Sequence, residues 1–119
     1  MRFTHANAFD TATVTIANGA SLSDALNCGG LRLFAILLPA SWTTANITLQ
    51  VSHDGGTTWK NLHDSFGSEY TIIAAADRLI TLNAADLAAF QHIRLRSGTA
   101  TTAVNQGADR IITCLMRSI

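Results

Sequence analysis

Short segments that alternate between apolar and polar residues, separated by turn-forming residues, are the feature that most constrains this 119-residue chain. In residues 11–17, Val14 and Ile16 alternate with threonines, and in residues 92–96, Ile93 and Leu95 alternate with His and Arg. A period of two is typical of β-strands with one buried face. The other segments with strand character are 31–39, 47–52, 58–62, 70–74, 78–82 and 110–118. We therefore expect about eight short strands and little helix.

The predicted fold is all-β: an antiparallel two-sheet β-sandwich, jelly-roll-like, formed by a single domain over residues 11–119. Residues 1–10 are predicted to be an N-terminal arm. Only residues 83–90, with Leu87 and Phe90 three apart, indicate a helical turn or two. The segment 31–39 is apolar on both faces apart from Arg32, so we expect it at the centre of a sheet or beneath an interface.

The chain is unusually poor in charge for a small protein. Charged residues are 13% of the sequence, about half of the roughly 25% found in soluble domains. Eight basic and eight acidic residues cancel, so neither nucleic acid nor a membrane is expected as a partner. No apolar run reaches the roughly 18 residues of a spanning helix, and the first ten residues lack the apolar core of a secretory signal. We expect synthesis and assembly in a cytoplasm.

A surface of Thr, Ser, Asn and Ala suits contact with other protein molecules, and a homo-oligomer is predicted, with a trimer as one option. Aromatic side chains dominate interface energetics, which favours the two phenylalanines of the arm as anchors. The outward side chains His92, Arg94 and Arg96 are expected to bind an anion or an acidic neighbour, or else to form a solvated strand face. The candidate interface residues are Phe3, Phe9, Trp42, Arg94 and Arg96.

Residues 51–62, VSHDGGTTWKNL, carry the most distinctive local motif. Its S-x-D-x-G-x-T-W spacing is similar to the Asp-box, which is repeated in sialidases and other β-propeller proteins. Two glycines tolerate a tight turn, and a carboxylate at the turn entrance can accept backbone N–H bonds. One copy in 119 residues cannot build a propeller. We interpret the motif as a structural hairpin whose residues are Ser52, Asp54, Gly56, Thr58 and Trp59.

Trp59 and Leu62 are three residues apart, so a regular strand cannot point both side chains toward the core. Either a β-bulge lies between them or one of the two is exposed.

Sequence spacing gives no support for a metal, a cofactor or a catalytic site. The pairs His53-Asp54 and His63-Asp64 would lie at opposite ends of the hairpin strands, about 20 Å apart, whereas zinc ligands must meet near 2 Å from one point. No nucleophile elbow or phosphate-binding glycine loop is present in the sequence. The acidic residues lie in or beside predicted turns, where solvated or capping roles are expected.

Cys28 and Cys114 are too few for a disulfide scaffold. Two interpretations stay open: a pair of buried free thiols, or one bridge between an early loop and the last strand.

Beyond the hairpin, the order of short strand and loop motifs resembles a family of small structural proteins of tailed bacteriophages. These motifs are the Pro-Ala-x-Trp-Thr loop at 39–43, the S-x-D-G hairpin, IRLRSGT at 93–99 and VNQGADR at 104–110. The resemblance covers roughly residues 10 to 117. It implies a β-sandwich virion component of the capsid decoration, head-fibre, spike-base or tail-adaptor type, and it transfers no active-site residues.

The sequence therefore predicts a non-enzymatic bacteriophage virion protein, most specifically a capsid decoration (cement) protein that stabilises the head shell after assembly in the host cytoplasm. Its partners would be the major capsid protein or other virion proteins. One alternative is a head-spike or tail-adaptor component. Another is a carbohydrate-binding module of a fibre, in which Trp42 or Trp59 stacks on a sugar. A glycosidase would need two carboxyl groups about 5 to 9.5 Å apart in a cleft.

Overall fold

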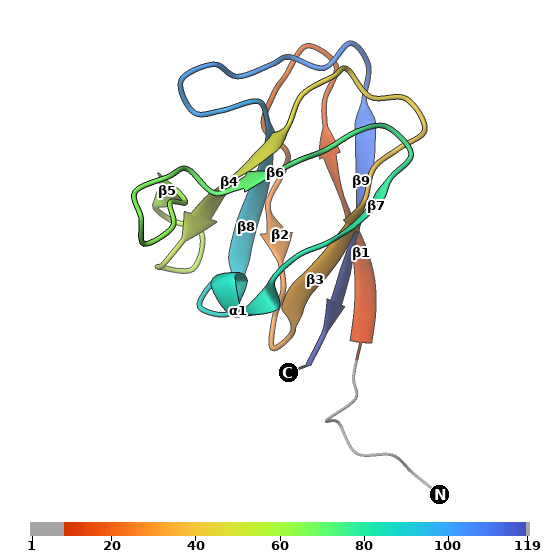
Figure 1. The fold of residues 1–119 in the computed structure, drawn as a ribbon. Helices are drawn as coiled ribbons and strands as arrows, with labels where there is room; N and C mark the ends of the chain where they lie inside the picture. Colours follow the sequence, from red (N-terminus) through yellow and green to blue (C-terminus); the bar gives the residue numbers. More distant parts are fainter. Residues whose placement is uncertain (1–8, 119) are drawn as a thin grey trace, which may run out of the picture.

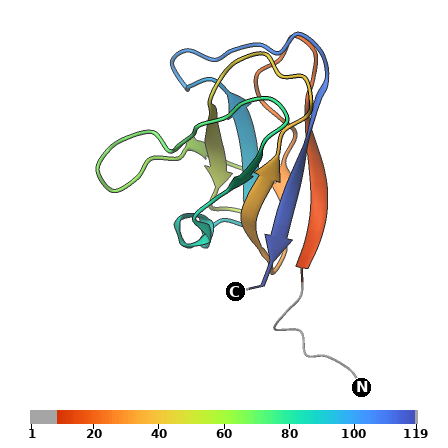
Figure 2. The ribbon, with the colours of Figure 1, turned by 45° about the vertical axis from the view of Figure 1, so that its right-hand side comes forward.

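The computed structural model describes residues 9–118, which form two antiparallel β-sheets packed face to face (Figure 1). The first sheet has four strands. In spatial order they are β1 (Phe9–Ile16), β9 (Arg110–Arg117), β3 (Arg32–Leu37) and β7 (Leu79–Thr81). The second sheet has the order β2 (Leu26–Asn27), β8 (His92–Ser97), β4 (Ile47–Ser52) and β5 (Trp59–Asn61), and β6 (Thr71–Ile72) also pairs with β4. Figure 2 separates the two layers.

Nine strands fill eight positions in this sandwich. β5 pairs with residues 50–52 of β4 and β6 pairs with Ile47 and Thr48, so together they occupy one edge. Along the chain, strands alternate between the sheets except at β5 and β6, and every pair is antiparallel. This is the two-sheet, eight-position arrangement of a jelly roll, and it confirms the predicted fold class.

One apolar layer between the sheets forms the core. Alternate residues of each strand point into it, as the period of two requires. Val14 and Ile16 of β1 and Ile93 and Leu95 of β8 all belong to it, and each is at most 1% exposed. The other large side chains buried below 2% exposure are Leu33, Ile36, Leu38, Ile47, Leu49, Leu87 and Ile112, together with the polar Gln106.

A single helical turn closes one end of the sandwich. α1 (Ala84–Leu87) begins after Asn83, whose side chain accepts the Ala85 N–H at 3.1 Å and caps the turn. Leu87 is fully buried and anchors the turn to the core. Within residues 9–118 no helix has the length and hydropathy that a membrane crossing requires.

The boundary between arm and domain differs from the expectation. β1 begins at Phe9 and pairs residue by residue with β9, so Phe9 and Asp10 belong to the sheet. The alternation is obscured there because Phe9 and Asp10 are both exposed. Phe3 lies outside the described residues.

Gly98 marks a close backbone approach at the end of β8. Its φ is +89°, and a Cβ at this position would lie 2.6 Å from the Thr102 carbonyl oxygen and 2.7 Å from the Val104 amide nitrogen. Gly67 has nearly the same φ, +90°, but a Cβ there meets nothing within 4 Å. A side chain at either position would strain the backbone, but only a side chain at position 98 would also clash with neighbouring atoms. Comparing substitutions at the two glycines therefore separates the two effects.

We predict that Gly98→Ala is much more destabilising than Gly67→Ala. The left-handed φ alone should lower the unfolding free energy of either variant by about 1–2 kcal/mol, and overpacking should remove a further 1–3 kcal/mol, approximately, at position 98. Thermal or urea unfolding of both variants measures the difference. Equal losses would show that the 98–104 turn relaxes around the added methyl group.

Candidate functional site

The Asp-box hairpin is held by its own side chains. Ser52 Oγ donates to Asp54 Oδ1 at 2.8 Å and accepts the Gly56 N–H at 2.8 Å. Asp54 Oδ1 also accepts the Thr58 N–H at 2.7 Å, and Trp59 Nε1 donates to the Gly56 carbonyl at 3.0 Å. Gly55 and Gly56 have φ values of +76° and +94°, which side chains with a Cβ rarely adopt. Every motif residue is thus engaged in closing the turn.

Trp59 lies on the outer face of the five-stranded sheet. It pairs with Ser52 of β4, and the Arg94 guanidinium stacks 4.1 Å from the centre of its ring. Leu62, three residues later, packs against the core instead. The two side chains therefore point to opposite faces and no bulge interrupts β5, and the outward Trp59 is half-buried beneath Arg94 rather than exposed. Arg94 covers one face of the ring, which leaves Trp59 poorly suited to stack on a sugar.

The turn bonds also set the ionisation of Asp54. Hydrogen bonds from Thr58, and secondly from Ser52, hold the pKa of the Asp54 carboxyl well below its usual range. A carboxyl with a depressed pKa cannot serve as a general acid near neutral pH. The group acts on the backbone of the turn.

No metal centre is apparent in the described chain. Within residues 9–118, no three His, Cys, Asp or Glu side chains gather closely enough to hold an ion. His53 lies in the turn after β4. His63 lies in the excursion between β5 and β6, where its backbone forms an isolated antiparallel β-bridge with Glu69.

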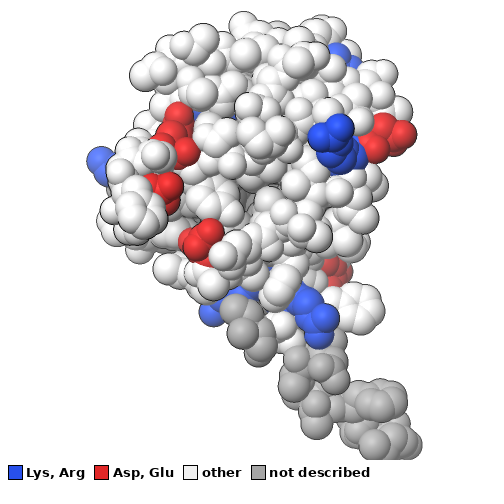
Figure 3. Space-filling view, viewed as in Figure 1, with Lys and Arg blue, Asp and Glu red and all other residues white. Residues whose placement is uncertain are grey.

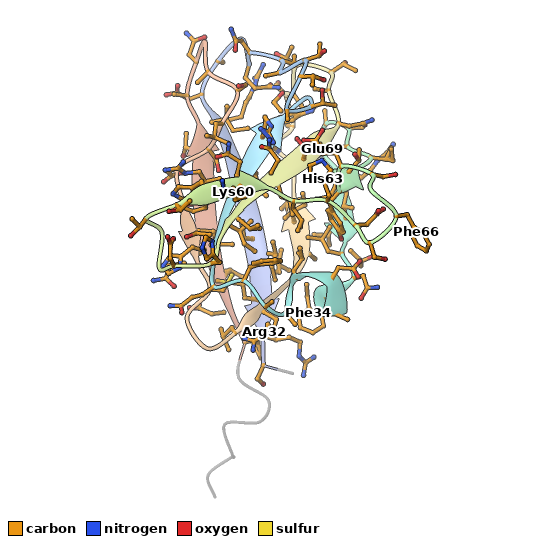
Figure 4. The ribbon with its side chains drawn as sticks, turned by 90° about the vertical axis from the view of Figure 1, so that its left-hand side faces the viewer. Arg32, Phe34, Lys60, His63, Phe66 and Glu69 are labelled. Carbon is orange, nitrogen blue, oxygen red and sulfur yellow. The ribbon has the colours of Figure 1, made fainter. Side chains whose placement is uncertain are left out.

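Arg96 departs from the prediction of an outward interface residue. It points to the outer face, yet its side chain is only 8% exposed. Its Nε donates to Thr48 Oγ1 at 3.1 Å, both terminal nitrogens donate to Asn61 Oδ1 at 2.9 Å, and Nη2 lies 3.3 Å from Glu69 Oε2. The excursion over residues 62–70 folds back across β4 and β8 and covers the guanidinium. Figure 4 shows His63 and Glu69 together over this sheet.

The same excursion builds a polar hollow on the surface. Asp64 Oδ1 accepts the N–H groups of Phe66 and Ser68, which stiffens a turn that holds Phe66 94% exposed at its tip (Figure 4). The hollow has a volume of about 460 Å³. It is lined by Leu62, His63, Asp64, Ser65, Phe66, Tyr70 and Asp86. Burial, and secondly Asp86, raises the pKa of Tyr70.

Trp42 also departs from the prediction, because it is buried and its Nε1 donates to the Ala45 carbonyl at 3.0 Å. It cannot serve as an exposed anchor or as a sugar platform. Beside it, the fully buried Gln106 side chain bonds to the Thr43 backbone at 2.8 and 3.0 Å, to Ser97 Oγ at 2.7 Å and to Arg110 Nε at 3.1 Å. The Gln106 side chain therefore ties together three segments: the Trp-Thr loop, the IRLRSGT strand and the VNQGADR segment. We call this group of buried hydrogen bonds the polar node.

The two cysteines are free and buried. Burial, and secondly Cys28, raises the pKa of the Cys114 thiol to about 12, and burial raises that of Cys28. Neither thiol can supply a thiolate near neutral pH. Of the two interpretations, the pair of buried free thiols is therefore the one that fits the structure.

The outer face of the four-stranded sheet is apolar and uncovered within the described chain. We call it the apolar outer face. Four of its side chains are strongly exposed: Phe9 at 79%, Leu79 at 60%, Ile111 at 56% and Leu37 at 39%. Phe34 and Leu115 also lie on it, and with Phe9 they line a shallow apolar depression of about 250 Å³. Threonines share this face with them: Thr11, Thr13, Thr15, Thr81 and Thr113.

The signal for this face was present in the sequence but ambiguous. Segment 31–39 is apolar on both faces apart from Arg32, which predicts a central strand or an interface. β3 and β9 are indeed the inner strands of their sheet. Since the sheet has the core on only one side, the second apolar face is left outward.

No protein-family model, curated protein or solved structure matches this chain. The class that the fold and the site define is a β-sandwich with a self-closed hairpin, a polar node and one apolar outer face.

We predict that Asp54 stabilises the fold only above acidic pH. A depressed folded-state pKa means that the contribution is complete above the unfolded pKa of about 3.9 and is lost as the pH falls through the folded value. Thermal melts of the wild type and Asp54→Asn from neutral to acidic pH provide the measurement. The melting temperatures should differ at neutral pH and converge in acid. A constant difference would contradict this assignment.

We predict that Arg96→Ala lowers the unfolding free energy by about 3–5 kcal/mol, because Glu69 loses its buried partner. Arg94→Ala is the matched control on the same strand and face, and loss of its stack on Trp59 should remove only about 0.5–1 kcal/mol. Urea unfolding measures both. Comparable losses would mean that the Arg96 bonds add little to stability.

Proposed function

We propose that this chain is a non-enzymatic structural protein of a tailed-bacteriophage virion, most specifically a capsid decoration protein. The observation that carries the proposal is the apolar outer face. Monomeric proteins seldom expose contiguous apolar patches beyond a few hundred Å², and larger ones mark contact with other macromolecules. Here four strongly exposed large side chains lie on one sheet.

The remaining surface supports the same role. The side of the molecule in Figure 3 is mostly uncharged, in keeping with the 13% of charged residues. A weakly charged surface places little desolvation cost on burial against protein. Jelly-roll sandwiches occur in viral capsid and lectin domains, which is a likeness of fold alone. The resemblance of the short strand and loop motifs to phage structural proteins is what supports a role in a virion.

Such a protein would stabilise the particle by burying its apolar surface against other virion proteins. Each copy would bind the major capsid protein or another virion protein through packed apolar contacts, with no cofactor and no reaction. Specific interfaces bury about 1,600 Å² in total. Repetition over a symmetric shell makes small contacts act together, since each bound copy raises the effective concentration of the next contact. The protein would then reside in the virion, after assembly in the host cytoplasm.

The runner-up is a head-spike, tail-adaptor or fibre module that binds glycan. The observation that favours it is the 460 Å³ hollow, which combines Asp64, Asp86 and Tyr70 with the exposed ring of Phe66. Carboxylates and an aromatic ring are groups that sugars contact through hydrogen bonds and stacking. A glycan would bind there, because Trp42 is buried and Trp59 is covered by Arg94.

We predict that quantitative mass spectrometry of purified virions finds this chain at a copy number comparable with that of the major capsid protein. Virions lacking it should lose their genome at a lower temperature than the parent, because the shell contacts are gone.

Absence of the chain from purified particles would overturn the proposal. A much smaller copy number, with impaired host adsorption of Phe66→Ala virions, would favour the fibre or adaptor module.

A further inference from the structure

The polar hollow is built from two parts of the chain that are well separated in sequence. Residues 62–66 and Tyr70 line it from the excursion, and Asp86 lines it from α1. Its volume of about 460 Å³ lies within the roughly 300–1,000 Å³ range of ligand sites. The chemistry of its walls therefore indicates what it can bind.

The walls of the hollow carry uncompensated negative charge. Asp64 and Asp86 both line it, and no lysine or arginine does. Asp64 Oδ1 accepts two N–H groups of its own turn, whereas the Asp86 carboxylate receives no hydrogen bond and no ion pair from residues 9–118. The one basic side chain on the wall, His63, has its Nδ1 3.3 Å from the Asn61 carbonyl oxygen. Figure 3 shows acidic side chains on the side that carries β6 and α1, so the hollow favours a cation.

The Tyr70 hydroxyl is a second polar group of the hollow that has no hydrogen-bond partner in the described chain. The Tyr70 ring packs against the core, which fixes its position. Burial, and secondly the charge of Asp86, raises the pKa of Tyr70, so the hydroxyl stays protonated near neutral pH. A protonated phenol still accepts hydrogen bonds through its oxygen. An N–H donor in the hollow can therefore bond to both the Tyr70 oxygen and a carboxylate.

An exposed aromatic ring stands at the rim of the hollow. Phe66 is 94% exposed, although Asp64 fixes the turn that presents it (Figure 4). A ring held in a fixed turn loses little conformational entropy on binding, and aromatic residues are typical anchors of protein interfaces. A free small cation would leave the Phe66 ring in water, whereas a protein can bury it. Ring faces also attract cations, and the aliphatic stem of a basic side chain can pack against apolar groups such as Leu62.

We propose that the polar hollow binds a lysine or arginine side chain of a partner protein. The cationic head lies between the Asp64 and Asp86 carboxylates and the Tyr70 hydroxyl. Phe66 packs against the same partner. Hydrogen bonds between ionised groups are about twice as strong as neutral ones, and complementary charge selects the correct partner. The site is independent of the role proposed for the apolar outer face, because none of the residues of that face lines the hollow.

The test is NMR titration of the purified full-length chain with N-acetyl-lysine methylamide. N-acetyl-norleucine methylamide is the matched ligand, because it has the aliphatic stem without the ammonium group, and it should cause no saturable shift. The lysine probe should shift the signals of Tyr70 and Phe66 saturably, with a dissociation constant of roughly 1–10 mM for one basic side chain in an open site. Asp86→Asn should raise this constant about fivefold. Asp77→Asn is the matched control, the same substitution at an exposed carboxylate outside the hollow, and should leave it unchanged.

The proposal would be overturned by the absence of a saturable shift with the lysine probe, by equal binding of the norleucine probe, or by equal weakening in the two Asn variants. Circular dichroism checks that both variants are folded. Titrations with D-glucosamine and D-glucose distinguish a glycan from a protein. Tighter binding of D-glucosamine than of the lysine probe would reject a protein partner, and equally tight binding of D-glucose would reject a cation and favour the glycan module. Copy number in virions is measured separately, so loss of this site leaves the proposed structural role standing.

Discussion

The apolar layer between the two sheets is the constraint on which the rest of the structure depends. Each strand can direct only alternate residues into this layer, so every strand also has an outward row that must be solvated or covered. The two sheets meet this requirement differently. The five-stranded sheet is covered by its own chain, through the Arg94–Trp59 stack and the excursion over residues 62–70. The four-stranded sheet keeps an apolar outward row.

Polar side chains hold the covering segments in place. Arg96 joins β8 to Asn61 and Glu69, and Gln106 joins the 104–110 segment to Thr43 and Ser97. Both groups are buried, and a buried polar group must be hydrogen-bonded to be tolerated. The long loop after β8 is thus tied down by a structural node, and the polar residues of this small protein mostly serve its own loops. This division leaves the four-stranded sheet with large apolar side chains exposed on its outer face.

Much of the fold was predictable from the sequence. The alternation at Val14 and Ile16 and the spacing of Leu87 and Phe90 identified real elements, and the apolar segment at residues 31–39 identified an inner strand. Alternation says which side of a sheet a residue occupies, but not whether another segment covers that side. Arg96 was therefore assigned to the correct, outward face but wrongly expected to be accessible. Trp42 was misjudged because the path of a loop leaves no periodic signal.

The apolar outer face was the hardest feature to predict, since a strand apolar on both faces can equally be covered by its own chain or by another molecule. Hydroxyl-radical footprinting of purified virions tests the central claim most directly, because Ile111 on this face and Ile73, which follows β6 in the other sheet and is 67% exposed, can be compared within one sample. If the face is an assembly surface, Ile111 should be oxidised several-fold more slowly than Ile73, although Ile111 is 56% exposed in the isolated chain. Oxidation of Ile111 as fast as that of Ile73 would contradict the account.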